Sequence, residues 1–371
     1  MTSTLPVTVD DRRALWALTE RHLRSPSFPA VLLVRHALRR GATSIRVTQT
    51  RAMVRVVDNG APLDADIDAV DAVLAAPTVA RMHDLERDHG IEVLTATATA
   101  RAAVVVGRRW RLETAQGTVT RRVPDRSEEN VVELHRDGHL RAQEHQELRS
   151  WLPSPRARVT VNGRALGAPP ELPDAIALPR SMSTPDGKGV IGFALDDAVS
   201  RVTYLARGVW VAHEQHRPRG LPVRAIWDHN VLAPHPDEIL VEARRRVAAA
   251  TEQLIAQLGE QFTGLTAPTR RALRTRLLRS DVVPPALVDV PLFDSDDGAF
   301  CVSLRALMAR ERIVVGSASG DVVGDDDARA FLRRRFGDRV KDALPPPRRR
   351  ALAVVRAVKD AIQNLGAPPR G

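Results

Sequence analysis

Apolar residues recur at helical spacing over two stretches near the start of the chain. Leucines spaced three to five positions apart predict a first helix within residues 10–24. A second helix is expected to begin after Ser27, which has the side chain of an N-cap residue, with Pro29 in the first turn. The apolar spacing ends near Gly41, and the predicted helix ends there too.

Alternation of apolar and polar residues follows this helix. Residues 44–49 and 52–57 alternate and are expected to pair as strands. Asp58-Asn59-Gly60 then forms a tight turn, where these residue types are favoured by their backbone preferences. The pattern over residues 66–88 returns to that of a helix.

The next part of the chain mixes apolar and alternating segments. Gly90 opens an apolar segment, and alternating strands are expected around Trp110 and Val119. A helix near residues 140–151 precedes a strand that turns at Asn162-Gly163, a pair typical of two-residue hairpins.

The chain is expected to form three domains, over residues 1–168, 169–260 and 261–371. The first boundary is placed at Pro169-Pro170 and Pro173. Beyond it we expect strands over residues 188–233 and helices over 236–259 and 267–280, with a final helix after Pro345-Pro346-Pro347.

Composition and charge narrow the class of protein. Of 371 residues, 43% are hydrophobic and 27% charged, which is typical of a globular protein, and no apolar run is long enough to span a bilayer. The first residues lack a secretory pattern and Cys301 is the single cysteine, so we expect a cytoplasmic protein without disulfides.

The net charge of +10 raises the question of nucleic-acid binding. Arginine triplets at 244–246 and 333–335 fall on helical stretches with acidic neighbours, which favours solvated helix faces. Aromatic residues make up only 4% of the chain, so single-strand stacking is not favoured.

One ordered set of motifs resembles a known family. His22-Leu23-Arg24-Ser25, the following helix, the paired strands, Asp58-Asn59-Gly60 and the segment Gly90–Thr95 occur in the order found in the Bergerat (GHKL) ATPase superfamily. They are most similar to the ninety-kilodalton heat-shock chaperones, and MutL-type repair proteins share the fold. The resemblance implies an α+β chain: an N-terminal Bergerat-type α/β sandwich, a second α/β middle-type domain and a small, mostly helical C-terminal region.

The helix over residues 29–40 lacks the polar groups that the family places there. The resemblance puts Leu32 at the position of the glutamate that acts as general base, and His36 at the position of the asparagine that helps to hold magnesium. Leu32 takes no proton, and the His36 nitrogen is a poor magnesium ligand. Arg39 and Arg40 stand where the family has a further acid.

The turn after the second strand keeps part of the family pattern D-x-G-x-G. Asp58 matches the aspartate that accepts a hydrogen bond from the adenine amino group, and Gly60 matches the first glycine. Pro62 replaces the second glycine and fixes the backbone where the base would approach. A simple tight turn at Asp58-Asn59-Gly60 remains the alternative.

The phosphate-closing segment of the family, G-x-G-x-x-S/T, corresponds to residues 90–95. Gly90 and Thr95 match it, whereas Glu92 replaces the second glycine. A carboxylate at this position repels a triphosphate.

These substitutions lead to three hypotheses. The first is a chaperone-like module without hydrolysis, acting on protein clients or a partner protein; its nucleotide contacts would be limited to His36, Asp58, Gly60, Gly90 and Thr95. The second is an ATPase with Mg-ATP as cofactor, whose base is supplied by Glu92 or Asp88. The third is a MutL-like, DNA-associated protein. We expect no resident metal and no membrane partner.

Two further motifs are weaker. His213-Glu214-Gln215-His216 has histidines three apart in a strand context, so a surface hairpin is favoured over a zinc site. Asp294–Gly298 lacks the distal glutamate of a calcium loop and is expected to be a hairpin turn. No P-loop or nucleophile-elbow motif occurs.

Overall fold

The computed structural model describes residues 28–136, 144–167, 176–218, 220–232, 236–280, 282–294, 301–316, 322 and 326–342. Several predictions from the sequence lie outside these residues: the helix within 10–24, the segment His22–Ser25, the cap at Ser27, the boundary at Pro169–Pro173 and the helix after Pro347.

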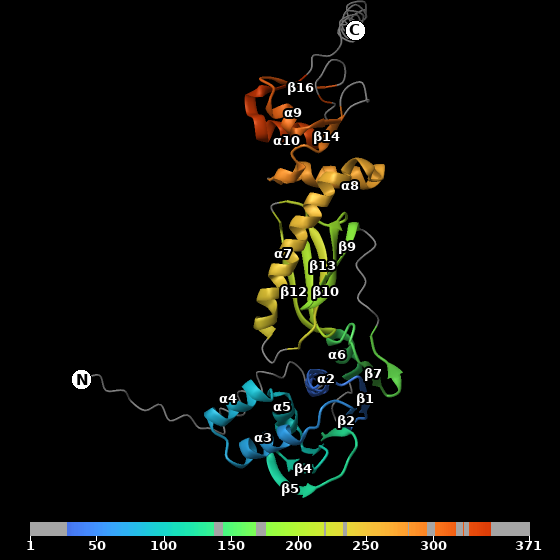
Figure 1. The fold of residues 1–371 in the computed structure, drawn as a ribbon, viewed down its shortest axis with the longest axis vertical. Helices are drawn as coiled ribbons and strands as arrows, with labels where there is room; N and C mark the ends of the chain where they lie inside the picture. Colours follow the sequence, from blue (N-terminus) through green and yellow to red (C-terminus); the bar gives the residue numbers. More distant parts are fainter. Residues whose placement is uncertain are drawn as a thin grey trace, which may run out of the picture.

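The N-terminal unit is an eight-stranded mixed sheet covered by helices (Figure 1). Its strands lie in the order β5-β4-β3-β6-β2-β1-β7-β8, and β1 pairs with β7 in parallel while the other neighbours are antiparallel. The helices are α2 (Pro29–Arg39), α3 (Asp64–Ala75), α4 (Val79–Asp88), α5 (Glu92–Thr99) and α6 (Glu144–Trp151); the strands are β1 (Ser44–Gln49), β2 (Met53–Asp58), β3 (Ala102–Val106), β4 (Trp110–Ala115), β5 (Thr118–Pro124), β6 (Asn130–His135), β7 (Arg158–Val161) and β8 (Arg164–Ala165).

The first helix and hairpin confirm the predictions made for them. Pro29 lies in the first turn of α2, Phe28 takes the N-cap position, and Gly41 follows the helix with a φ of 81°. In the antiparallel pair β1/β2, Val47 lies opposite Val56, and both side chains are buried. Alternate residues thus face the helices, as expected for a strand with one covered face.

The helical pattern over residues 66–88 corresponds to two helices. The helix α3 ends at Ala75, and α4 begins at Val79 after Pro77. Thr78 caps α4, since its hydroxyl accepts a hydrogen bond from the Arg81 N–H at 3.3 Å. Because proline disfavours helical geometry in the residue before it, the chain turns here.

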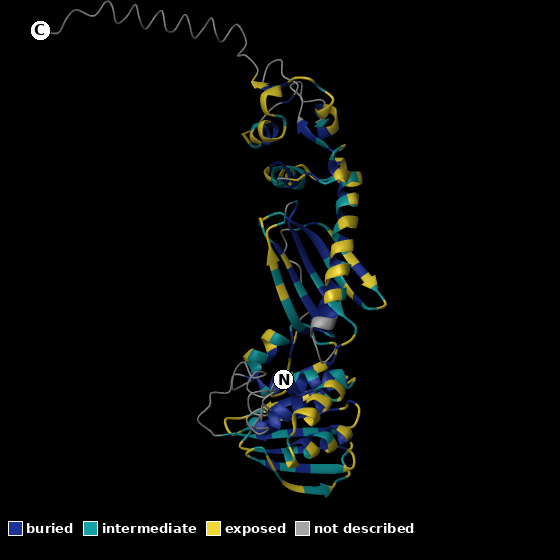
Figure 2. Ribbon diagram, turned by 90° about the vertical axis from the view of Figure 1, so that its left-hand side faces the viewer, coloured by how far each residue is buried: buried dark blue, intermediate teal, exposed yellow. Residues whose placement is uncertain are grey.

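The second unit is a five-stranded sheet with one long helix along one of its faces (Figure 2). Its strand order is β12-β11-β13-β10-β9, and Phe193 and Trp227 are buried in its core. The elements are β9 (Ile176–Thr184), β10 (Gly187–Ala194), β11 (Ser200–Ala206), β12 (Val209–His216), β13 (Val223–His229) and α7 (Pro236–Gln261).

The remaining elements continue beyond the end of this sheet (Figure 1). They comprise α8, α9 and α10 with two short strand pairs, β14/β15 antiparallel and β16/β17 parallel. Their bounds are η1 (Phe262–Gly264), α8 (Ala267–Arg279), η2 (Pro285–Leu287), β14 (Pro291–Asp294), β15 (Cys301–Ser303), α9 (Leu304–Met308), β16 (Ile313–Val315), α10 (Asp326–Phe336), η3 (Gly337–Arg339) and β17 (Val340–Asp342).

These elements confirm the predicted α+β class with two successive sheets. One hydrophobic core is built mainly from residues 28–166 and a second from residues 177–340. The domain limits at 168 and 260 both stay predictions, and the first core also takes in Ala206, Val209, Leu232 and Ile239. Within the described ranges, no helix is both long and apolar enough to cross a membrane.

An aromatic contact joins the two sheets. The ring of Trp151 on α6 lies edge-on to Phe28 at 5.2 Å between centroids, and edge-on to Trp210 of β12 at 4.7 Å. The Arg156 guanidinium adds an ion pair to Asp228 of β13 at 2.8 Å. The second unit is therefore fixed against α6 and the start of α2.

Candidate functional site

The predicted nucleotide-site residues gather where α2, the turn after β2, and the starts of α3 and α5 meet. Leu32, at the family's base position, is 3% exposed and belongs to the hydrophobic core. Its neighbours in that core include Val31 and Leu33 on the same helix. This position therefore contributes packing, with no group that could activate water.

Arg40 and Asp58 form a buried ion pair across the turn. The distance from Arg40 Nη2 to Asp58 Oδ2 is 2.7 Å, and Arg40 also donates to the backbone carbonyl of Ala61. The other carboxylate oxygen, Oδ1, accepts from the Gly60 N–H at 2.8 Å and from Asn130 Nδ2 at 3.1 Å. Both oxygens of Asp58 are thus engaged by the protein itself.

Asn130 at the start of β6 holds the turn in place. Its amide nitrogen also donates to the carbonyls of Gly60 and Ala61, each at 3.1 Å, and its oxygen accepts from the Leu63 N–H at 3.1 Å. Asn59 braces the other side by accepting the Thr43 and Ser44 N–H groups, each at 2.9 Å. The turn is therefore rigid and satisfied internally.

A second set of charges lies one turn away on α2. His36 Nε2 is 3.2 Å from Asp66 Oδ2, and His89 Nδ1 is 3.1 Å from the other Asp66 oxygen. Glu92 Oε2 is 3.3 Å from Arg39 Nη2 and 3.8 Å from His36 Nδ1. We call His36, Arg39, Arg40, Asp58, Asp66, His89 and Glu92 the pocket charge cluster.

Burial and pairing together set the protonation of this cluster. For Glu92, burial opposes the charged form, but His36 and Arg39 outweigh it and lower the pKa from 4.5 to about 2. The pKa of Asp66 is also lowered, since its contact with His36 outweighs the burial that would raise it. For His36, burial favours the neutral form, yet Asp66 and Glu92 raise its pKa above 6.5.

His36 Nδ1 faces two competing groups. Arg39 Nη2 lies 2.8 Å from it and donates to a neutral imidazole, whereas an imidazolium donates from the same nitrogen toward Glu92. With His36 protonated, the cations Arg39, Arg40 and His36 balance the carboxylates Asp58, Asp66 and Glu92.

The predicted glycines have a role in this packing. Gly90 has a φ of 77°, and a β-carbon at this position would meet the Arg39 guanidinium and the Glu92 carboxylate. A β-carbon on Gly60 would lie 3.0 Å from Asp58 Oδ1 and 3.2 Å from the Ala42 nitrogen. Side chains and backbone of the protein itself approach both positions too closely for a larger residue, and this explains the glycines.

The remaining predicted contact, Thr95, is completely buried in α5. Its hydroxyl has no hydrogen-bond partner within the described ranges. Pro62 is exposed beside the turn. Nucleotide binding by His36, Asp58, Gly60, Gly90 and Thr95 stays a prediction, although the structure brings the first four into one region.

Sequence reasoning missed Asp66, His89 and Asn130, which complete the cluster and the turn. Asp66 lies in the first turn of α3, where the helix dipole favours acidic residues. An acid at this position is therefore expected in any helix and does not by itself indicate a contact with His36. Asn130 lies 72 residues from its partner Asp58, and no local pattern joins them.

The other candidate motifs are structural. His213 and His216 lie on the edge strand β12, where His213 contacts Thr203 and Gln215. Asp294 ends β14, which pairs with β15, and the rest of the predicted turn at Asp294–Gly298 lies outside the described residues. Over the described ranges, no three His, Cys, Asp or Glu side chains are grouped to hold a metal ion.

The arginines of the triplet on α7 are each paired with an acid, and their expected role as a solvated face stays a prediction. Arg244 pairs with Glu214 at 2.6 Å, Arg245 with Glu242 at 2.7 Å, and Arg246 with Asp186 at 2.6 Å. In the second triplet, Arg333 pairs with Asp342 at 2.6 Å.

Comparison with known proteins finds a distant likeness. No protein-family model matches the chain, and no curated protein matches it. Among solved structures, the ATPase domain of the mismatch repair endonuclease MutL from Aquifex aeolicus aligns with 12% identity over 60% of this chain and 97% of that chain, at a TM-score of 0.31. The same domain complexed with ADP gives 14% identity, the same coverage and a TM-score of 0.32. At these TM-scores the likeness carries no weight for fold or activity.

Proposed function

We propose that residues 28–167 form a Bergerat-type scaffold whose nucleotide pocket is filled by the protein's own charged side chains. The protein would then act as a chaperone-like binding or regulatory module without ATP hydrolysis. The observation that carries this proposal is the ion pair between Arg40 and Asp58, which is 2.7 Å long and leaves 10% and 4% of the two side chains exposed.

Asp58 is the residue that would recognise adenine. An adenine amino group would have to share the Asp58 carboxylate with the protein's own donors, with Arg40 at Oδ2 or with Gly60 and Asn130 at Oδ1. Opening this site would leave the Arg40 charge without its partner in a region shielded from water. Breaking a buried pair in this way costs about 3–5 kcal/mol, which any nucleotide would have to offset.

Magnesium fits the site poorly. A magnesium ion prefers oxygen ligands in octahedral geometry. On α2 the family's ligand position holds His36, whose two nitrogens face Asp66, Arg39 and Glu92. We therefore assign no catalytic step to Mg-ATP in this protein.

The hypothesis of an ATPase with rearranged groups has less support. Its candidate base Glu92 is held against Arg39 and His36, and a pKa of about 2 makes a carboxylate a weak base at neutral pH. The other candidate, Asp88, pairs on the surface with Arg87 at 2.8 Å.

The experiment is a thermal unfolding series with and without millimolar Mg-ATP, together with a phosphate-release assay. We expect no change in Tm and no hydrolysis above background. A ligand present at 100 times its Kd would add about 2.7 kcal/mol to the free energy of unfolding, so binding is readily detected.

Two variants make the assay specific. Asp58→Asn changes the proposed adenine position, and Asp84→Asn makes the same change on the exposed surface of α4. Hydrolysis that persists in Asp84→Asn and is lost in Asp58→Asn would show a working site and overturn the proposal. A Tm increase with Mg-ATP that Asp58→Asn alone removes would overturn the claim of a filled pocket.

A further inference from the structure

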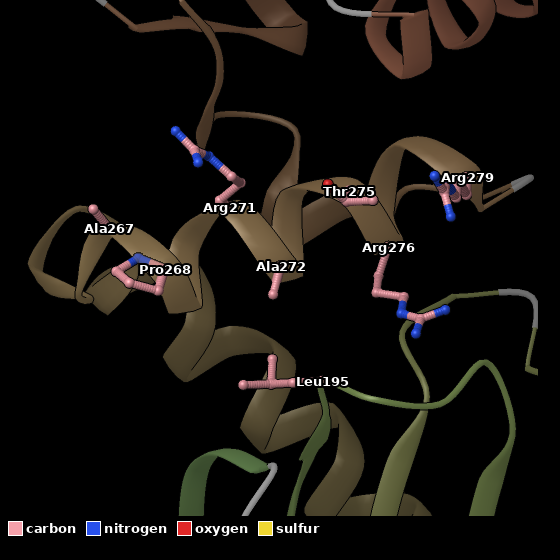
Figure 3. A pocket seen from close by; sticks show the side chains of 8 residues that line it. All are labelled: Leu195, Ala267, Pro268, Arg271, Ala272, Thr275, Arg276 and Arg279. Atoms are coloured by element: carbon pink, nitrogen blue, oxygen red, sulfur yellow. The ribbon is translucent and has the colours of Figure 1, made fainter.

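An open cavity lies between α8 and the end of the five-stranded sheet, far from the pocket charge cluster. It has a volume of about 500 Å³ and is lined by Leu195, Arg271, Ala272, Thr275, Arg276 and Arg279, among others. In Figure 3, Leu195 faces Ala272, and the three arginines leave α8 at successive points along its length. Ala267, Pro268, Ala272 and Thr275 line the cavity together with the three arginines.

The sequence of α8 makes this face cationic. Over Ala267–Arg279 the helix holds five arginines and no acidic residue. Its opposite face, with Leu273, Leu277 and Leu278, is buried in the second core. Residues 268, 271, 272, 275, 276 and 279 recur at helical spacing, so they share the face that lines the cavity.

Ion pairs and favourable positions in the helix dipole account for only some of the arginines on α8. Arg279 pairs with Asp327 at 3.0 Å, and arginines in a last helical turn are favoured by the helix dipole. Arg271 lies in the first half of α8, where the dipole disfavours a cation. Neither Arg271 nor Arg276 forms an ion pair with any residue in the described ranges.

Acids near the cavity are already engaged. Asp197, two residues after Leu195, pairs with Arg224 at 2.9 Å and with Arg201 at 2.8 Å. Asp196 lies 3.8 Å from Arg224. Arg271 and Arg276 are therefore available to a ligand, whereas Arg279 and the triplet on α7 are paired with acids.

The arrangement favours an extended polyanion over a single anion. Arg271 and Arg279 are separated by about 12 Å along the helix axis, at 1.5 Å per residue. A second, separate cavity of about 370 Å³, lined by Ser280, Phe331, Arg334 and Arg335, lies near the end of α8. Guanidinium groups spaced in this way match phosphates along a strand, because each presents a planar fork of donors.

We propose that the arginine face of α8, with the adjoining end of α10, binds the phosphate backbone of duplex nucleic acid without reading its sequence. The lining of the first cavity contains no aromatic side chain, and Phe331 at the second cavity is only 3% exposed, so the surface offers charge and no platform for unpaired bases. This proposal is independent of whether the N-terminal pocket binds a nucleotide.

The test uses the full-length protein and a fluorescently labelled 24-base-pair DNA duplex of mixed sequence. Binding is measured by anisotropy at several salt concentrations between 50 and 200 mM. We expect the affinity to fall steeply with salt, because neutralised phosphates release counterions. The double variant Arg271→Gln/Arg276→Gln should bind about tenfold more weakly at 50 mM salt and show a slope of log K against log salt smaller by about 2.

A matched control separates this site from net charge. Arg244→Gln/Arg245→Gln also removes two positive charges, but from arginines already paired with Glu214 and Glu242. It should bind the duplex within about twofold of the unmodified protein. Tm values of all proteins show whether each variant is folded, and Arg271→Lys, which keeps the charge, provides a milder variant.

Three results would overturn the proposal. The first is no binding of the duplex at 50 mM salt. The second is an equal loss of affinity in the α7 control, which would assign the binding to net charge. The third is displacement of the duplex by a polyglutamate peptide or by inorganic pyrophosphate at a lower concentration than by unlabelled duplex, which would assign the face to an acidic protein segment or a small phosphate compound.

Discussion

The guanidinium of Arg40 lies 2.7 Å from the carboxylate of Asp58, with 10% and 4% of the two side chains exposed. Arg40 follows the last residue of α2 and Asp58 is the last residue of β2, so the pair ties the helix to the sheet. The family resemblance would have Asp58 face adenine. In this structure it faces the chain's own cation.

Replacing Arg40 with methionine should destabilise the protein. The change keeps much of the side-chain volume but leaves the Asp58 charge without its cation, at a cost of about 3–5 kcal/mol in the free energy of unfolding. The measurement is urea unfolding at pH 7. The double variant Arg40→Met/Asp58→Asn should recover part of the loss, since no unpaired charge remains. A loss under about 1 kcal/mol, typical of an exposed pair, would contradict this account.

The stability of the protein should decline at pH values above 6.5 through His36. Its folded pKa is raised by Asp66 and Glu92, so its contribution is complete below the unfolded value of 6.5 and is lost as pH rises through the folded value. The charged groups facing the ring are Asp66 on α3, Glu92 on α5, and Arg39 on its own helix.

The variant His36→Gln isolates this effect. Free energies of unfolding measured from pH 5.5 to 9 should fall less steeply in His36→Gln than in the unmodified protein. His135→Gln serves as control, because this ring is 43% exposed on β6. Equal slopes for His36→Gln and the unmodified protein would mean that His36 is neutral throughout.

Glu92 should account for much of the change in unfolding free energy below pH 4.5. Its pKa falls from 4.5 to about 2, so its contribution is complete above pH 4.5 and is lost as pH falls through 2. A shift of this size corresponds to about 3 kcal/mol. In Glu92→Gln, the decrease in unfolding free energy between pH 4.5 and 2 should be smaller by a large part of that amount. An unchanged decrease would show that Glu92 is not ionised against Arg39.

Much of the local structure was predictable from the sequence. Side-chain alternation gave the hairpin of β1 and β2 within one residue, and Pro29 and Gly41 marked the limits of α2. The helical pattern of residues 66–88 hid a break, because the pattern alone does not show whether Pro77 kinks one helix or separates two.

The site was less predictable because its contacts join distant residues. The sequence shows Arg40 only as a basic residue at a position where the family has an acid. No pattern of neighbouring residues indicates that its partner is Asp58, 18 residues later. The sequence alone predicts only that Glu92 repels phosphate. In the structure its carboxylate lies near the cations of α2, on a helix 53 residues after Arg39.

Gly90→Ala should cost more stability than Gly163→Ala. Both glycines have left-handed φ values, 77° and 80°, so the strain on an alanine, about 1–2 kcal/mol, is shared. Only at Gly90 would the new methyl group meet the Arg39 guanidinium and the Glu92 carboxylate; at Gly163 no atom lies within 4 Å. We expect a difference of about 1 kcal/mol or more by urea unfolding. Equal costs would mean that the charge cluster rearranges freely.

Leu32→Glu restores the residue type that the family uses as general base, and we expect it to give no hydrolysis. Leu32 is 3% exposed among apolar neighbours, so a carboxylate there is either neutral or strongly destabilising. The expected loss is about 4 kcal/mol in the free energy of unfolding, whereas Leu32→Met, which conserves volume, should cost less than about 1.5 kcal/mol. Urea unfolding and phosphate release are measured on both variants. A stable Leu32→Glu protein that hydrolyses ATP would show that a single substitution separates this chain from an active enzyme. The ion pair of Arg40 with Asp58 argues against that outcome, because the new carboxylate would still lack an adenine contact beside it.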